Sequence, residues 1–333
     1  MGTRALFSTG ILPSKFTSTT TGTPSAPVNT VAPALSGDFF VGQTLTCSTG
    51  SWTGFPAPTY TYQWRNAGVD IGGATSSTYV LQASDDGDSI TCNVTATNAS
   101  GSASQVSNAF IAIQTRLFLD ADDPATVISS GGTVSQWSDK SGNASNFTNA
   151  NVPTQPSTGV VTINSRNTVS SNATAGVTLD GGGTSLRDYL AAGSYDVYIV
   201  YVRTVDQGGR LMQVSSGATA AVTFTLNANG NVAMNVGGTA TTTTGSDDLL
   251  PHLYYASATN SLNTIDRDGA TQGTQATVSV PVSVTQVTRL FRDFNDLNRL
   301  AAGIGEIIVC RNLSSAEETQ MLARVASKWG ITV

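Results

Sequence analysis

The residues that could do acid–base or nucleophilic chemistry are few in this chain. Its one histidine, His252, stands in the segment LLPHLYY, at the start of an apolar run that is typical of a β-strand. No G-x-S-x-G nucleophile elbow occurs, so a serine–histidine–acid arrangement would depend on His252 alone. A lone histidine in this position is more often a strand-edge residue than a general base. The sequence therefore predicts no nucleophilic catalysis.

Glycoside hydrolysis would need two facing carboxylates, and the acidic residues do not suggest such a pair. The chain has three glutamates: Glu306 stands alone in a predicted strand, and Glu317 and Glu318 belong to a predicted helix start. Asp266 and Asp268 alternate in the segment IDRDG, but the glycine that follows them indicates a tight turn. We therefore expect that the protein is not an enzyme.

Two aspartate-rich loops are the best candidates for a metal site. The segment LDADDP contributes Asp120, Asp122 and Asp123, and WSDKSGN contributes Asp139. Carboxylate oxygens suit a hard cation, so Ca²⁺ is the candidate ligand. The alternative is that these aspartates only form turns and end strands.

Cys310 has no second cysteine or histidine nearby, which makes zinc implausible, and nothing else in the sequence requires a cofactor.

Two more cysteines, Cys47 and Cys92, lie on either side of the segment YTYQWRNAG, which contains Trp64. Short runs with period-two alternation surround them, separated by Gly, Asn and Asp, as in QTLTCSTG and SITCNVTATN. This pattern predicts a β-sandwich over residues 28–114. Cys47 and Cys92 either form a disulfide or are small core residues, and a reducing cytosol would favour the thiols.

The composition favours an all-β protein of two domains. Charged residues make up only 11% of the 333 residues, and Ser, Thr, Asn and Gly take their place. Such a composition favours many short strands joined by polar turns. The net charge of −6 and the scattered basic residues exclude electrostatic capture of nucleic acid or of an anionic membrane. We expect no membrane insertion, because no segment is long and apolar enough to span a bilayer.

Residues 1–27 have the pattern of an anchoring arm. The low-complexity run TSTTTGTPSAP cannot bury enough surface to order itself, so we expect the arm to lie on a neighbouring protein. The alternative is that it packs on its own domain. Its apolar anchor residues are Leu6, Phe7, Ile11, Leu12 and Phe16. The start MGTRALFSTGILPSKF does not resemble a signal peptide, because its apolar stretch is interrupted.

Residues 115–333 predict a second, larger β-region with one helix near its end. The run Tyr195 to Val202 is apolar on both faces, which is typical of a doubly covered central strand. In LSSAEETQMLARVASKWGI, Ser314 or Ser315 with a glutamate three residues later forms a capping box, and Gly330 ends the helix. We expect this helix to dock on the sandwich through Trp329.

These motifs resemble two known families. PALSGDFFVGQTLTCSTGSW, with the spacing Cys47…Trp64…Cys92, resembles bacterial and phage immunoglobulin-like repeats, although Ile90 stands where many members carry the corner tyrosine. LDADDP…VSQWSDKSGN, LDGGGTSL, IDRDGA and the terminal strand–helix–Trp–Gly segment resemble laminin-G-like, concanavalin-A-like jelly rolls. The resemblance implies that Trp64 packs on the two cysteines and that calcium binds at a loop edge, as in many laminin-G-like domains.

This order of domains resembles virion proteins of tailed bacteriophages. The resemblance implies a non-enzymatic structural protein that decorates the capsid or forms a head or tail fibre, with its N-terminal arm bound to the major capsid or another virion protein. A homo-oligomer, such as a trimer, and contact with host surface carbohydrate are further expectations. The alternative is a secreted adhesin or carbohydrate-binding module on a bacterial surface. Fold resemblance alone does not distinguish these functions.

Overall fold

A computed structural model describes most of the chain outside its first residues. The described residues are 22–149, 157–172, 179–181, 186, 189–190, 194–204, 208–216, 219–226, 232–236, 239–242, 249–258, 262–268, 270–276, 287–291 and 301–333. The predicted anchor residues, which lie outside these ranges, are Leu6, Phe7, Ile11, Leu12 and Phe16. We call residues 22–113 the N-terminal unit and residues 115–333 the C-terminal unit.

The N-terminal unit consists of short strands in three sheets. The sheets are the pair β1–β4, the sheet β2–β3–β7 and the sheet β10–β8–β5–β6, in which β9 also pairs with β8. The elements are β1 (Ser25–Val31), β2 (Leu35–Ser36), β3 (Thr44–Cys47), β4 (Ser51–Phe55), β5 (Thr59–Asn66), β6 (Val69–Asp70), β7 (Thr78–Val80), the 3₁₀ turn η1 (Ala83–Asp85), β8 (Ser89–Asn98), β9 (Gly101–Val106) and β10 (Phe110–Ile111).

The predicted alternation places the core of this unit correctly. In β3, Leu45 and Cys47 are buried and alternate with the exposed Thr44 and Thr46, and every second residue of β8 from Ile90 to Ala96 is buried. Trp64 of β5 is fully buried and packs with Cys47 and Cys92, which lie on strands of different sheets. The alternation of side chains on a strand explains this result, because it sends each apolar residue into the same interior.

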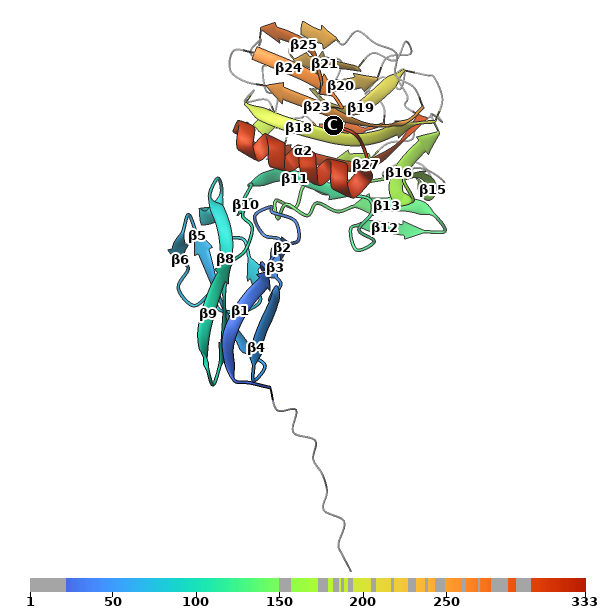
Figure 1. Cartoon of the computed structure of the whole chain (residues 1–333). Coiled ribbons are helices and arrows are strands. Elements are labelled where there is room, and N and C mark those ends of the chain that lie inside the picture. Colours follow the sequence, from blue (N-terminus) through green and yellow to red (C-terminus); the bar gives the residue numbers. More distant parts are fainter. Residues whose placement is uncertain are drawn as a thin grey trace, which may run out of the picture.

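The C-terminal unit contains a curled network of antiparallel strands. Its strands are β11 (Thr115–Asp120), β12 (Val127–Ser130), β13 (Thr133–Trp137), β14 (Phe147–Thr148), β15 (Ser157–Ile163), β16 (Arg166–Asn172), β17 (Leu179–Gly181), β18 (Tyr195–Arg203), β19 (Gly209–Ser216), β20 (Thr219–Leu226), β21 (Val232–Val236), β22 (Thr239–Thr242), β23 (Pro251–Ala258), β24 (Leu262–Arg267), β25 (Ala270–Ala276), β26 (Val287–Leu290) and β27 (Ala301–Cys310). The all-β prediction is confirmed, and the curled sheet fits the expected jelly roll (Figure 1).

Strand β18 is the central strand that the sequence predicts. Each of its residues is buried, and it pairs with β23 on one side and with β27 on the other. Strand β27 is also buried throughout, and its other side pairs with β11 and with β16. The apolar run on both faces of these strands reflects cover on both sides, because one face meets the interior of the C-terminal unit and the other meets a helix.

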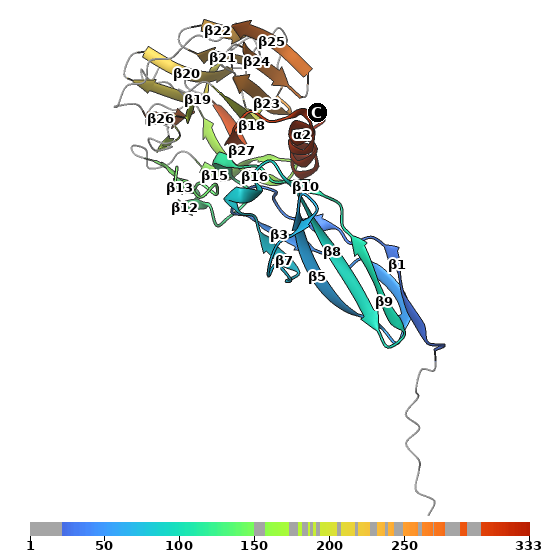
Figure 2. The same ribbon diagram turned by 90° about the vertical axis from the view of Figure 1, so that its left-hand side faces the viewer.

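That helix is α2 (Ser315–Trp329), which begins and ends as predicted. Glu317 accepts hydrogen bonds from the backbone N–H of Ser314, at 2.8 Å, and from its hydroxyl, at 2.7 Å. Gly330 ends the helix with φ of 64°, a left-handed conformation that glycine adopts without strain. The helix lies between the β18–β27 sheet and the N-terminal unit in both views (Figures 1 and 2).

The close approach of α2 to β27 needs a residue without a side chain at position 305. A Cβ atom at Gly305 would lie 2.7 Å from the ring of Trp329, which is completely buried. We therefore expect Gly305→Ala to lower the free energy of unfolding by about 1–3 kcal/mol, because the indole must shift in a packed core. The measurement is urea unfolding followed by tryptophan fluorescence. The matched control is Gly72→Ala, where no atom lies within 4 Å, and equal stability losses in both variants would contradict this packing argument.

Candidate functional site

The two units meet through an aromatic contact next to α2. Phe39 and Phe40 of the N-terminal unit are 2% and 0% exposed, because they enter a hydrophobic cluster that includes Phe118 of β11 and Val325 of α2. The rings of Phe40 and Phe118 lie edge to face with their centroids 4.8 Å apart. Burial of these large rings provides an apolar driving force for docking of one unit on the other.

Hydrogen bonds from α2 hold the end of the N-terminal unit in place. The side-chain amide of Gln320 donates to the carbonyl of Ile111 at 2.8 Å and accepts from its N–H at 2.7 Å. Arg311, which precedes the helix, pairs with Asp86 of the N-terminal unit at 3.0 Å and also pairs with Glu317. Burial opposes ionisation of Glu317, but the hydrogen bonds from Arg311 and Ser314 lower its pKa to about 2.

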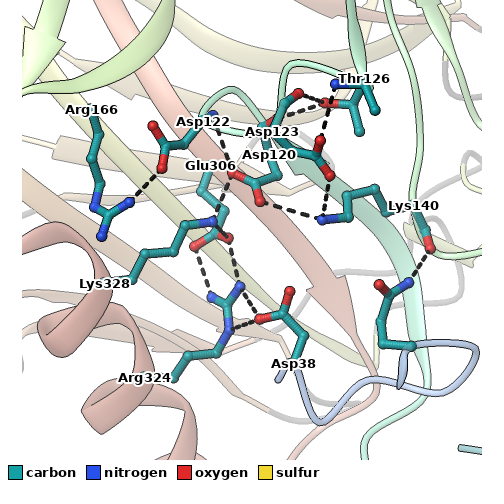
Figure 3. Close-up of polar contacts among 12 residues, drawn as sticks. Asp38, Asp120, Asp122, Asp123, Thr126, Lys140, Arg166, Glu306, Arg324 and Lys328 are labelled. Carbon is teal, nitrogen blue, oxygen red and sulfur yellow. Dashed lines mark hydrogen bonds and ion pairs between the residues drawn. The ribbon is translucent and has the colours of Figure 1, made fainter. Parts of the chain in front are cut away.

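A fully buried carboxylate lies beneath α2, at the centre of the polar network in Figure 3. Glu306 of β27 accepts hydrogen bonds from two nitrogens of Arg324, both at 2.9 Å, from Lys328 at 3.0 Å and from the indole N–H of Trp329 at 3.0 Å. Burial opposes ionisation of Glu306, but Arg324 and Lys328 lower its pKa to about 2. Arg324 also donates to Asp38 of the N-terminal unit at 2.8 Å. One guanidinium therefore links both units.

The aspartates predicted to bind a metal have cationic partners in this network. Asp120 pairs with Lys328 at 2.7 Å, and Asp123 pairs with Lys140 at 2.9 Å. Burial and the neighbouring carboxylate of Glu306 raise the pKa of Asp120, whereas the hydrogen bond from Lys140 lowers that of Asp123. Asp120 and Asp123 converge on the ammonium of Lys140 (Figure 3), so a positive charge is already present between these carboxylates.

The remaining two predicted ligands, Asp122 and Asp139, have different partners and do different things in the structure. Asp122 forms an ion pair with Arg166 of β16. Asp139 shapes the loop after β13, because it accepts hydrogen bonds from the backbone N–H groups of Phe118, Ser141 and Ser145 at 2.8–3.0 Å. Within the described ranges, no three His, Cys, Asp or Glu side chains converge as metal ligands would. Calcium at these residues stays a prediction, and the geometry supports the turn-forming alternative more directly.

His252 has a partner that the sequence did not reveal. Its Nδ1 lies 2.7 Å from Oδ2 of Asp268, whose Oδ1 accepts the backbone N–H of Leu253 at 2.9 Å. Asp268 has φ of +50° in the turn after β24, which agrees with the turn predicted from the glycine that follows it in the sequence. The strand-edge interpretation of His252 fits its place at the start of β23, but the pair itself depends on the register of β23 and β24.

Cys47 and Cys92 are free thiols in this structure, and both are buried. Their mutual hydrogen bond raises the pKa of the Cys47 thiol and lowers that of the Cys92 thiol, so Cys92 is the thiol of the pair that ionises first. The disulfide between them stays a prediction. Cys310 is also buried as a free thiol and faces the carbonyl of Asp196, which agrees with a core position rather than a zinc ligand.

Of the described tryptophans, Trp52 and Trp137 do not present a fully exposed ring on which a glycan could pack. Trp52 is half-buried and donates its indole N–H to the carbonyl of Thr49 at 2.7 Å, and Trp137 is fully buried. Both are structural residues.

Among the described helices, none combines the length and the apolar character needed to cross a membrane.

The sequence matches no family model and no curated protein. Solved structures with similar folds include a Trypanosoma rangeli sialidase, with 11% identity and a TM-score of 0.48 over 86% of this chain and 49% of that chain. Another is the botulinum neurotoxin serotype D binding domain, with 9% identity and a TM-score of 0.47 over 66% of this chain and 55% of that chain. This chain spans about half the length of these structures. Likeness at this level carries no argument about activity or ligand.

The fold and the network together define a class of protein: an all-β molecule of two sandwich units whose joint is fixed by a C-terminal helix. The charged residues at the joint are engaged with one another. Their arrangement suits mechanical coupling of the units, because each charge is held by an opposite charge or a hydrogen bond in a partly buried setting.

The low pKa of Glu306 predicts acid sensitivity in a defined range. Its folded value of about 2 lies below the ordinary value of 4.5, so its stabilising contribution is complete above pH 4.5 and is lost as the pH falls toward 2. We expect Glu306→Gln to cost about 3 kcal/mol at neutral pH and to unfold with a weaker pH dependence in this range. The measurement is urea unfolding followed by circular dichroism at a series of pH values.

The control for this prediction is Glu318→Gln, which removes a half-buried carboxylate from α2 instead of the one beneath it. Asp120 has a raised pKa, in part because of Glu306, and acts in the opposite direction, so the difference between the wild type and Glu306→Gln reports the two neighbouring carboxylates together. Parallel pH profiles for the wild type and Glu306→Gln would show that the buried ion pair does not have the energetic role assigned to it.

Proposed function

We propose that this chain is a non-enzymatic structural protein of a virion surface. The part of the 1–27 arm that precedes residue 22 attaches it to the major capsid or another virion protein, the N-terminal unit acts as a spacer, and the C-terminal unit is presented outward. The proposal includes a location on the capsid or tail surface, homo-oligomerisation, for instance as a trimer, and contact with host surface carbohydrate. Two things support this role: the resemblance of the sequence to virion proteins of tailed bacteriophages, and the placement of the N-terminal unit relative to the C-terminal unit.

The observation that carries the proposal is that the N-terminal unit has the start of β1 at one end and its contact with the C-terminal unit at the opposite end. Strand β1 begins at the end of the N-terminal unit that points away from the C-terminal unit, in both views (Figures 1 and 2). The other end of that unit is bound by Gln320 and Arg324 of α2 and by Arg311, which precedes the helix. A protein held at residue 22 would therefore carry its larger unit away from the surface of attachment.

A secreted bacterial adhesin or carbohydrate-binding module is the alternative, since a spacer with a presented unit would serve there as well. The two functions differ in where the full-length protein is found. Detection of the chain in purified virus particles by mass spectrometry supports the virion role. Its presence only on the surface of bacterial cells, or free in the medium, supports the adhesin.

Deletion of residues 1–21 tests attachment by the arm. This deletion leaves β1 (Ser25–Val31) complete, so both units should retain their melting temperatures. We expect the deleted protein to be absent from particles assembled in its presence, because the apolar anchors of the arm supply the binding energy. Incorporation is measured by quantitative immunoblotting of gradient-purified particles. Normal incorporation of the truncated protein would exclude attachment through the arm.

The rigid joint gives a separate prediction about shape. The double variant Asp38→Ala, Gln320→Ala removes one ion pair and two hydrogen bonds between the units but leaves the buried pair of Glu306 and Arg324 intact. Small-angle X-ray scattering should then show a broader distribution of interatomic distances than in the wild type. Asp70→Ala, which removes the exposed pair with Arg65, is the control and should change stability by less than about 1 kcal/mol. Identical scattering from the double variant and the wild type would mean that these contacts do not fix the joint.

A further inference from the structure

An open pocket of about 400 Å³ lies beside the C-terminal end of the chain, on the C-terminal unit. It is formed where the start of β23, the turn after β24, the turn between β15 and β16 and the residues after α2 meet. Its volume falls in the range of roughly 300–1,000 Å³ that is usual for small-molecule sites. Its principal lining residues are Asn164, Leu250, Pro251, His252, Asp268 and Ile331.

The polar groups in this pocket are held in fixed positions. Asp268 is oriented by His252 at 2.7 Å and by the N–H of Leu253 at 2.9 Å. The side-chain NH₂ group of Asn164 donates hydrogen bonds to the carbonyl of Trp329 at 2.6 Å and to that of Gly330 at 3.2 Å. The amide oxygen of Asn164 is thereby left as an acceptor. A carboxylate and an amide oxygen on the lining of one pocket provide acceptors for a ligand that donates hydrogen bonds.

Apolar surface lies next to these acceptors. The side chain of Leu250 lines the pocket and is 61% exposed, and its neighbour Leu249 is 54% exposed. Pro251 and Ile331 complete the apolar part of the lining. Large aliphatic side chains held this far in solvent at a pocket rim are available to cover the apolar face of a bound molecule.

The charge of the pocket narrows the class of ligand. Among the described residues that line the pocket, Asp268 and His252 are the titratable side chains, and they pair with each other. The described lining therefore offers no lysine or arginine to hold a phosphate, a sulfate or an acidic sugar. A single carboxylate and a single imidazole that already pair with each other do not make a metal site. The ligand that matches is neutral, rich in hydroxyl donors and apolar on one face.

We propose that this pocket binds a neutral sugar residue. Vicinal hydroxyls of a pyranose donate to Asp268 and to the amide oxygen of Asn164, while the C–H face of the ring packs on Leu250 and Pro251. Glycan binding by this pocket rests on the proposed contact with host surface carbohydrate and gives that contact a place on the C-terminal unit. The turn of Asp268 and the end of α2 hold the acceptors before the ligand arrives, which lowers the entropic cost of binding.

The test uses the purified full-length protein and an array of neutral mono- and oligosaccharides, with acidic glycans on the same array. A positive sugar is then titrated by isothermal calorimetry against two variants. Leu250→Trp fills the pocket from an exposed position and should abolish binding without a change in melting temperature. Asp268→Asn should weaken binding by about tenfold or more, because a hydrogen bond to a charged acceptor is lost. Ile128→Trp, at a 51% exposed position on β12, is the matched control and should bind as the wild type does.

Several results would overturn the proposal. Binding that survives both Leu250→Trp and Asp268→Asn would place the sugar elsewhere, and absence of binding to every neutral glycan would remove the ligand class. Binding restricted to acidic glycans and lost at high salt would contradict the neutral-sugar assignment. Particle incorporation is measured on a different part of the chain, through the deletion of residues 1–21. The virion role and the sugar site can therefore fail independently.

Discussion

The buried charge of Glu306 is the constraint on which the architecture of this protein depends. Strand β27 places this carboxylate inside the molecule, where an ionised group without partners would be very costly. Arg324, Lys328 and the indole of Trp329 compensate it, and all three belong to α2. The helix therefore cannot leave the sheet without exposing a buried anion and three donors together. These contacts also fix the position of α2 along the sheet, because all the donors must align with one carboxylate.

The same helix then becomes the platform for the N-terminal unit. Arg324 extends from Glu306 to Asp38, and Gln320 one turn earlier binds the backbone of Ile111 as a neighbouring strand would. The apolar contact of Phe40 with Phe118 excludes water from the same region. Partly buried ion pairs gain from that exclusion, since their mutual attraction is screened less than at an exposed surface. The joint combines apolar burial, which favours docking, with charged contacts that favour one orientation.

Much of the fold could be predicted from the sequence because it is written in local patterns. The alternation around Cys47, Trp64 and Cys92, the doubly apolar run of β18, and the Ser314–Glu317 capping box each depend on residues a few positions apart. The site could not be predicted in this way. Its partners are distant in the chain, such as Asp122 and Arg166, and they meet only when the sheet has its register.

The metal prediction illustrates the same limit. The sequence shows that these loops are rich in carboxylates, but it does not show which basic side chains lie next to them. Lys140 from a loop and Lys328 from α2 both pair with Asp120. His252 illustrates the converse case. A lone histidine in an apolar segment has no visible partner, whereas the hairpin of β24 and β25 returns Asp268 to its ring. In both cases the partners of a side chain are set by its neighbours in space, which the residue type alone does not reveal.

Helix α2 connects the joint to the pocket near the C-terminus. Gln320 and Arg324 in the middle of the helix hold the N-terminal unit, while the carbonyls of Trp329 and Gly330 at its end fix the amide of Asn164. Trp329 also donates to Glu306, so the residue that orients Asn164 is itself held by the buried carboxylate. A pocket built on a helix end and two tight turns keeps its acceptors in place better than one built on long loops. The interaction that orders the joint is therefore also the interaction that preorganises the candidate sugar site.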